Sequence, residues 1–202
     1  MSYESCTHPL TLRWRIHEGR IVLRQRHLRS LEPLGLPAPL RAWLHERLEW
    51  AASNMLNENS EGVLVIAIDP ATDIVVSLDK LREPPHLTTA DLVFAAGTGA
   101  ITGVQHEGAP LAGDVWLERD DVLYASCDAL TSATGTLARD LAQTLNITVV
   151  VCPQQAVAIQ DSSAFLISDE FGFVPLATPT PTPTHRAPSA SQRLRECFDK
   201  LW

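Results

Sequence analysis

Two apolar runs separated by a short turn place the strongest constraint on how this 202-residue chain folds. Residues 63–68 and 74–78 are continuous apolar stretches, and residues 69–73 between them contain Pro70 and two aspartates. Proline and aspartate favour turn backbone, while a short apolar run bounded by turns is typical of a strand buried in a sheet. We therefore predict a pair of adjacent central strands, around which the N-terminal part of the chain packs.

The spacing of the remaining apolar residues predicts an ordered series of strands and helices. From residue 40 to 56, apolar side chains recur at intervals of three and four, which indicates a helix with one buried stripe that includes Trp43 and Leu44. For the helix that starts near residue 134, Ser132 or Thr134 is the candidate N-cap. The other expected elements are a hairpin over 10–23, a short helix over 26–34, a strand over 92–96, a hairpin over 114–124, a helix over 134–145, strands over 147–151 and 164–167, and a last helix over 189–201.

This order predicts an α/β chain, of the α+β kind, with two lobes. We expect an N-terminal lobe over residues 1–96 and a C-terminal lobe over 113–202, joined by a glycine-rich linker over 97–112. Residues 178–188 repeat Thr-Pro, which favours an extended polyproline-type segment and a surface tether for the last helix.

Charge and cysteine usage exclude several classes of function. The formal net charge of −8 opposes binding to nucleic acid or to anionic lipid, and no apolar run is long enough to span a bilayer. The four cysteines are far apart and lack metal-ligand spacing, so we expect free thiols, no metal, and a cytoplasmic protein.

Several segments, in order along the chain, resemble the class IV aminotransferases, the fold-type IV enzymes that depend on pyridoxal phosphate (PLP). Among them, aminodeoxychorismate lyases and branched-chain aminotransferases are the nearest in pattern. The segments that carry the resemblance are 26–31, 62–66, 112–124, 130–135 and 164–176. The resemblance implies the family's two-lobed fold with a shortened C-terminal lobe, and a homodimer with a small-molecule or protein ligand between the lobes. It also implies ligand-binding positions, which fall on Ser30, Thr131, Ser132, Thr134 and Ser168.

The departures from the family pattern fall on its chemistry. PLP enzymes carry the cofactor on a lysine amine, but the only lysines are Lys80 and Lys200, and neither matches the family position. Ser30 stands where the family has a phosphate-binding arginine, and Asp169 and Glu170 replace a phosphate-side "TNS" motif. We therefore expect a catalytically degenerate protein that uses no cofactor and acts as a binding or regulatory scaffold.

Two alternatives stay open at this point. Lys80 could carry PLP in an active aminodeoxychorismate lyase or aminotransferase. A PLP-independent enzyme could instead use the cleft between the lobes, with His106, Glu107 and Asp114 as general acids and bases, because a histidine beside carboxylates titrates near neutral pH.

Overall fold

The computed structural model describes residues 10–69, 73–96, 100–126, 132–151, 162–177 and 188–201. Contacts divide the chain into two compact units, Met1–Glu83 (unit 1) and Pro84–Trp202 (unit 2). Of the sequence-based predictions, Thr131 and almost all of the Thr-Pro segment lie outside the described residues.

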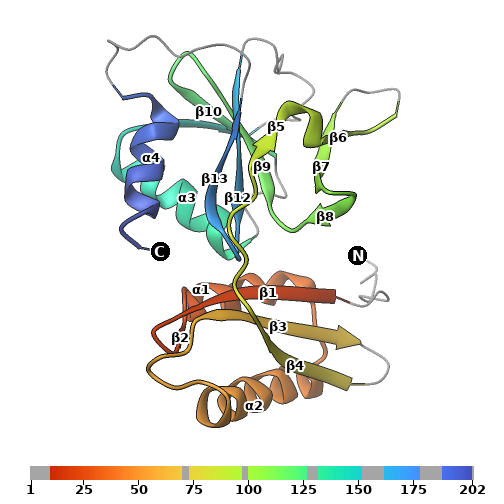
Figure 1. Cartoon of the computed structure of the whole chain (residues 1–202). Helices are drawn as coiled ribbons and strands as arrows, with labels where there is room; N and C mark the ends of the chain where they lie inside the picture. Colours follow the sequence, from red (N-terminus) through yellow and green to blue (C-terminus); the bar gives the residue numbers. More distant parts are fainter. Residues whose placement is uncertain are drawn as a thin grey trace. The chain divides into compact units, whose positions relative to one another are not determined.

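Unit 1 is built on an antiparallel sheet with the strand order β2-β1-β3-β4 (Figure 1). The strands are β1 (Leu10–His17), β2 (Arg20–Ile21), β3 (Gly62–Asp69) and β4 (Asp73–Asp79). Strand β3 pairs with β1 on one side and with β4 on the other, so the predicted central pair and the predicted N-terminal hairpin are both confirmed.

The helices of unit 1 cover one face of this sheet. They are α1 (Arg24–Ser30), the short 3-10 helix η1 (Glu32–Leu34) and α2 (Ala38–Asn54). Leu44 and Leu48 of α2 pack in one core with Trp14 of β1, whose ring stacks on the buried His27 ring at a centroid distance of 4.6 Å. Trp43 was predicted within the buried stripe but is 51% exposed, because it lies about 100° around the helix from Leu44.

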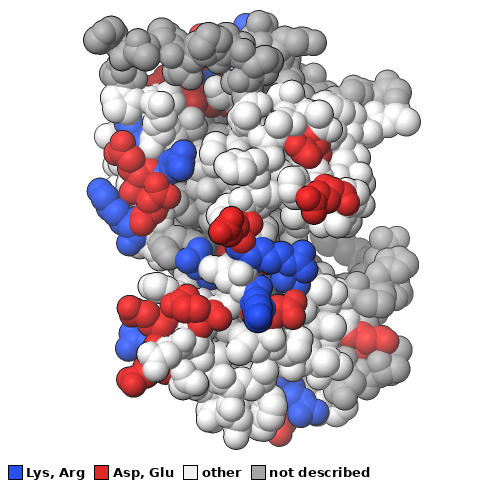
Figure 2. All heavy atoms as spheres, viewed as in Figure 1, with Lys and Arg blue, Asp and Glu red and all other residues white. Residues whose placement is uncertain are grey.

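Arg13 and Arg24 of unit 1 are paired with carboxylates. Arg13 Nη1 is 3.2 Å from Asp79 Oδ2 across the sheet, and Arg24 pairs with Glu49 of α2. Figure 2 shows the same mixture of basic and acidic side chains on the face that it draws. Across the described part of the chain, no helix combines the length and the apolar character needed to cross a membrane.

Unit 2 contains a six-stranded mixed sheet and a smaller three-stranded sheet. The orders are β11-β10-β9-β12-β13-β5 and β6-β7-β8. The strands are β5 (Leu87–Thr88), β6 (Leu92–Phe94), β7 (Ile101–His106), β8 (Ala109–Leu111), β9 (Asp114–Arg119), β10 (Val122–Ala125), β11 (Thr148–Val151), β12 (Ser163–Ser168) and β13 (Gly172–Ala177). The predicted 114–124 hairpin is confirmed as β9 and β10; Asp120 and Asp121, which both have positive φ, form its two-residue turn.

The two faces of the larger sheet are covered differently. On one face lie α3 (Ala133–Thr144) and α4 (Ala190–Phe198), seen side by side in Figure 1. Trp116, Phe165 and Phe173 form a chain of stacked rings that ends at Phe198 of α4. On the opposite face, Leu117 and Leu166 pack with Val104 of β7, which lies with β8 in the stretch interpreted from sequence as a linker.

The backbones of β9 and β12 approach closely at Gly113, just before β9. Gly113 has φ +150°, and a Cβ at this position would lie 2.6 Å from the carbonyl oxygen of Ile167. Only glycine fits such an approach without moving a strand. The next residue, Asp114, is paired with Ile167 and is the first residue of β9.

Candidate functional site at the start of helix α3

Helix α3 begins where β9 starts and β12 ends. Ser132 is the N-cap, and its Oγ accepts a hydrogen bond from the amide of Gly135 at 3.0 Å. The same hydroxyl donates to Asp114 Oδ2 at 3.0 Å. The sequence predicted Ser132 or Thr134 as the cap, and the structure assigns this role to Ser132 because its backbone is extended while Thr134 lies inside the helix.

A second carboxylate accepts a hydrogen bond from another amide in the first turn of the helix. The amide of Thr134 donates to Asp169 Oδ1 at 3.1 Å, and the Thr134 hydroxyl donates to the same oxygen. Asp169 belongs to the turn between β12 and β13, so a residue distant in sequence caps α3. Thr134 is fully buried, and its polar groups therefore depend on this carboxylate.

This arrangement decides the electrostatics of the helix start. The N-terminal amides of a helix carry partial positive charge and are suited to bind an anion. Here Asp169 is that anion, and a second carboxylate, that of Asp114, accepts a hydrogen bond from the cap residue Ser132. A further anion 4 Å from either carboxylate would be repelled by about 4 kcal/mol per pair of unit charges at an effective dielectric constant of about 20.

The other residues assigned by resemblance to ligand binding use their polar groups within the chain. Ser168 is buried, and its Oγ accepts from the Glu170 amide at 3.2 Å. Ser30 is in unit 1, where its Oγ donates to the His27 carbonyl oxygen at 2.8 Å. The structure therefore brings Ser132, Thr134 and Ser168 together near the β12–β13 turn, and their role in ligand binding stays a prediction.

Each lysine lies shortly after the end of a strand or helix. Lys80 directly follows β4 of unit 1, and Lys200 follows α4 of unit 2; both side chains are exposed. Within the described ranges, histidine, cysteine and acidic side chains form no cluster of three or more that could hold a metal ion.

The residues of the predicted acid–base group have separate partners. His106, at the end of β7, has its Nδ1 3.7 Å from Asp91 Oδ1, whereas Asp114 binds Ser132. Glu107 occupies the β7–β8 turn with φ +51°. Hydrogen bonds from the Thr88 amide and hydroxyl, followed by His106, hold the pKa of the Asp91 carboxyl below its usual range.

Sequence reasoning missed the capping roles of two carboxylates. Asp91 completes a capping box with Thr88 at the start of η2 (Thr89–Asp91), and the Thr-x-x-Asp spacing was the available signal. Asp169 was noted only as an obstacle to phosphate. Nothing local in the sequence indicates that it binds a helix 35 residues away.

With this geometry in place, comparison with solved structures defines the class: the chain has the class IV aminotransferase fold, as the resemblance implied. It is similar to 4-amino-4-deoxychorismate lyase from Pseudomonas aeruginosa, with a TM-score of 0.68 and 12% identity over 96% of this chain and 91% of that one. Branched-chain amino acid aminotransferase from Escherichia coli gives 0.64 and 12% identity over 100% and 87%. No protein-family model and no curated protein sequence matches the chain.

The same comparison corrects the expectation that no cofactor is involved. An aminotransferase from Brucella abortus bound to the co-factor PLP matches with a TM-score of 0.61 and 13% identity, over 95% of this chain and 88% of that one. The fold is thus one that takes a cofactor. The expectation failed because a missing lysine removes a covalent link, whereas a fold also holds a cofactor through contacts that need no lysine.

Proposed function

We propose that this chain is a derivative of the class IV aminotransferase fold that lacks lysine-dependent catalysis and acts as a binding or regulatory scaffold. The fold supports the first part of the proposal, since the solved lyase and aminotransferases match it along nearly all of its length. Fold alone does not assign activity, so the remainder depends on the side chains.

The observation that carries the proposal is the capping of α3 by the chain's own carboxylates. In the family pattern, the corresponding turn offers backbone amides to the cofactor phosphate. In this chain the Thr134 amide binds Asp169, and the Gly135 amide binds Ser132. A phosphate dianion would have to displace Asp169 and remain close to Asp114, which is electrostatically unfavourable.

The lysines support the same conclusion. A lysine that carries an aldehyde cofactor is held in a pocket that lowers its pKa, but Lys80 and Lys200 are exposed at the ends of surface elements. The residues at the start of α3 and the two lysines therefore do not fit a lysine-linked PLP.

Reaction with PLP followed by borohydride reduction tests the proposal. We expect no stoichiometric adduct on either lysine in peptide mapping. Exposed lysines react weakly with free aldehydes, so Lys80→Arg and Lys200→Arg serve as matched controls, and slight, equal labelling of both lysines indicates surface reaction. A one-to-one adduct confined to Lys80, which does not form when the chain is unfolded before the reaction, would contradict the proposal.

We also propose that the scaffold is a homodimer, as the family resemblance implies. Light scattering on the purified chain measures its mass in solution. A mass equal to one chain across the accessible concentration range would refute the dimer without affecting the PLP test.

A further inference from the structure

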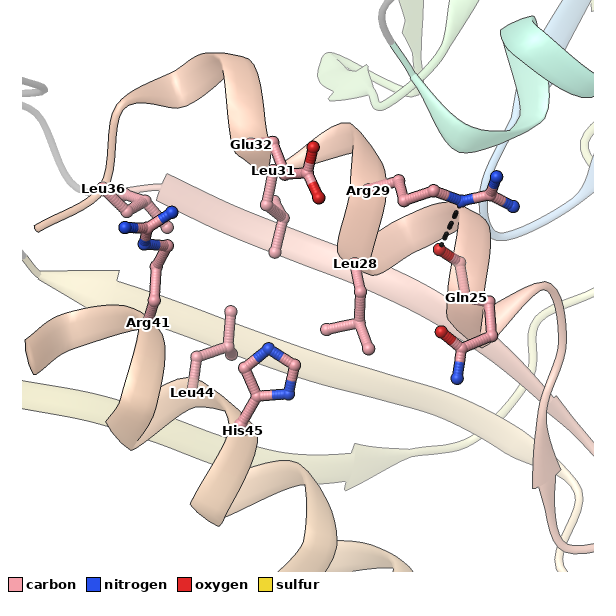
Figure 3. Close-up of a pocket in the computed structure, with 9 residues that line it drawn as sticks. All are labelled: Gln25, Leu28, Arg29, Leu31, Glu32, Leu36, Arg41, Leu44 and His45. Atoms are coloured by element: carbon pink, nitrogen blue, oxygen red, sulfur yellow. Dashed lines mark hydrogen bonds between the residues drawn. The ribbon is translucent and has the colours of Figure 1, made fainter. Parts of the chain in front are cut away.

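Unit 1 contains a cavity of about 250 Å³ between α1, η1 and the first turns of α2. Figure 3 shows Leu28, Leu31 and Leu44 near its centre and Leu36 at one side, next to Arg41, with further polar side chains around them. The lining residues are Gln25, Leu28, Arg29, Leu31, Glu32, Leu36, Arg41, Leu44 and His45. All nine belong to unit 1, so the cavity is formed without any residue of unit 2.

The floor of the cavity is branched and aliphatic. Leu31, Leu36 and Leu44 are 5%, 4% and 2% exposed, and Leu28 is half-buried. These side chains belong to the core of unit 1 or pack against it, which keeps the floor in place. Such a floor favours a ligand with an apolar body, because burial contributes about 25 cal/mol per Å² of apolar surface removed from water.

The rim supplies positive charge on one side. Arg41 and His45 are one helical turn apart on α2, and Figure 3 shows both side chains extending from α2 towards the leucines. Within the described residues, Arg41 forms no ion pair. Arg29 differs: its Nε donates to the Gln25 carbonyl oxygen at 3.2 Å, and Figure 3 shows its side chain directed away from the leucines.

Glu32 limits the charge of a suitable ligand. Its carboxylate is the only acidic group among the lining residues, and it lies on the η1 side of the cavity. With Arg29 directed away, Arg41 is the arginine that extends towards the leucines, and Glu32 repels a second negative charge on a ligand bound there. The rim therefore suits a single carboxylate better than a phosphate or a dicarboxylate.

The volume sets the size of the apolar body. An apolar cavity of about 150 Å³ holds benzene, and sites for drug-sized ligands begin at about 300 Å³. A cavity of about 250 Å³ lies between these limits. It accommodates one ring or a branched chain together with a short substituent.

From these observations we propose that unit 1 binds a small monocarboxylate with an apolar body, whose carboxylate pairs with Arg41 while its body rests on the leucine floor. The site uses no residue of the α3 segment and does not depend on the proposed loss of lysine-dependent catalysis. It gives the scaffold a ligand of defined chemistry.

Isothermal titration with phenylacetate tests the site, and phenylacetamide is its neutral isostere. We expect saturable binding of phenylacetate, with about three- to tenfold weaker binding of the amide, because a charge-assisted pair at a solvent-exposed rim has a modest effect. Arg41→Gln should weaken phenylacetate binding by a similar factor and leave the amide unchanged. Arg47→Gln, which alters an exposed arginine of α2 outside the lining, should change neither affinity.

Three results would overturn the proposal. The first is no heat of phenylacetate binding up to about 10 mM, beyond which affinity is too weak to be specific. The second is equal affinity for the acid and the amide on the native chain, a comparison that needs no variant to fold. The third is unchanged phenylacetate binding by Arg41→Gln, with circular dichroism confirming that the variant is folded. None of these results bears on the PLP test in the preceding section.

Discussion

Unit 1 and unit 2 both pack helices against a sheet, but they use the polar groups beside those helices in opposite ways. In unit 2 the amides at the start of α3 are bound by Asp169 and by the cap residue Ser132. In unit 1 the start of α2 presents Arg41 over a leucine-lined cavity. An anionic ligand would therefore be repelled at the first place and attracted at the second. The loss of a family's phosphate-binding residues in one unit thus gives no reason to expect that the other unit binds nothing.

The largest expected effects come from the cores that hold both regions in place. Phe165 is 1% exposed and stacks on Phe173 at 4.5 Å, so Phe165→Ala should lower the free energy of unfolding by about 3–5 kcal/mol. Leu48→Ala in unit 1 should cost about 2–5 kcal/mol by the same cavity mechanism. Urea unfolding measures both changes. Val75→Ala, at a 59% exposed position, is the control and should stay within about 0.5 kcal/mol.

The next largest effect on stability is expected for Asp169 of unit 2, and it should exceed the effect of changing Arg41 of unit 1. Asp169→Ala leaves the buried amide and hydroxyl of Thr134 without this acceptor, and should cost about 1–3 kcal/mol of unfolding free energy. Arg41→Gln should cost less than about 0.5 kcal/mol, because Arg41 is exposed. Asp120→Asn, at an 88% exposed turn position, controls for the loss of one carboxylate.

A binding measurement sharpens the same contrast. Asp169→Ser removes the carboxylate from the helix start, so its affinity for inorganic phosphate should exceed that of the native chain. Titration calorimetry with phosphate measures this difference. Equal or weaker phosphate binding by the variant would show that Asp169 is not what keeps anions from α3.

A smaller, matched effect concerns one carboxylate in each unit. The Glu18 amide, followed by His17, lowers the pKa of Glu61 in unit 1, as Thr88 does for Asp91 in unit 2. Both carboxylates therefore stabilise the fold above their unfolded pKa values of about 4, and this contribution is lost as the pH falls through their lower folded values. Thr88→Ala should raise the pKa of Asp91 and leave that of Glu61 unchanged. Side-chain carboxyl NMR titration measures both, and a shift of the two together would contradict a local origin.

The smallest effects are expected at surface ion pairs. Arg13 Nη1 lies 3.2 Å from Asp79 in unit 1, and Arg193 Nη2 lies 2.9 Å from Asp121 in unit 2. Arg13→Gln and Arg193→Gln should each lower the free energy of unfolding by less than about 1 kcal/mol. Both differences should shrink in about 1 M salt, where the screening length is about 3 Å. A loss that persists in high salt would indicate packing of the arginine stem rather than charge.

Much of the fold could be predicted because the long elements have clear periodicity. The β3–β4 pair, α2 and the β9–β10 hairpin follow from apolar runs and turn residues alone. Strands β5, β7 and β8 were not predicted, since they are short or contain glycine and are specified by pairing with distant residues. Trp43 shows what periodicity alone does not predict. The spacing identifies the apolar side of a helix, but which of its side chains are buried depends on the position of the sheet that packs against it.

The candidate sites could be predicted only in part. An N-cap depends on residues next to the helix, whereas the other contacts join segments that are far apart in sequence. Ser132 was one of the two candidates for the N-cap of α3, the other being Thr134, and the structure selects it. The bond between Asp169 and Thr134 joins a turn to a helix far apart in sequence, and only the paired register of β9 and β12 brings that turn near α3. The cavity of unit 1 likewise arises from the distance between α1 and α2, which no single motif encodes.

The missing side chain at Gly113 has a consequence for the whole acidic start of α3. A methyl group at this position would clash with the backbone of β12 at Ile167. Asp114 is the very next residue, so displacing β9 would carry its carboxylate away from Ser132 and loosen one of the two links that close the helix start. The hydrogen bonds that Asp114 and Asp169 form at the start of α3 therefore also require a residue without a Cβ atom at position 113.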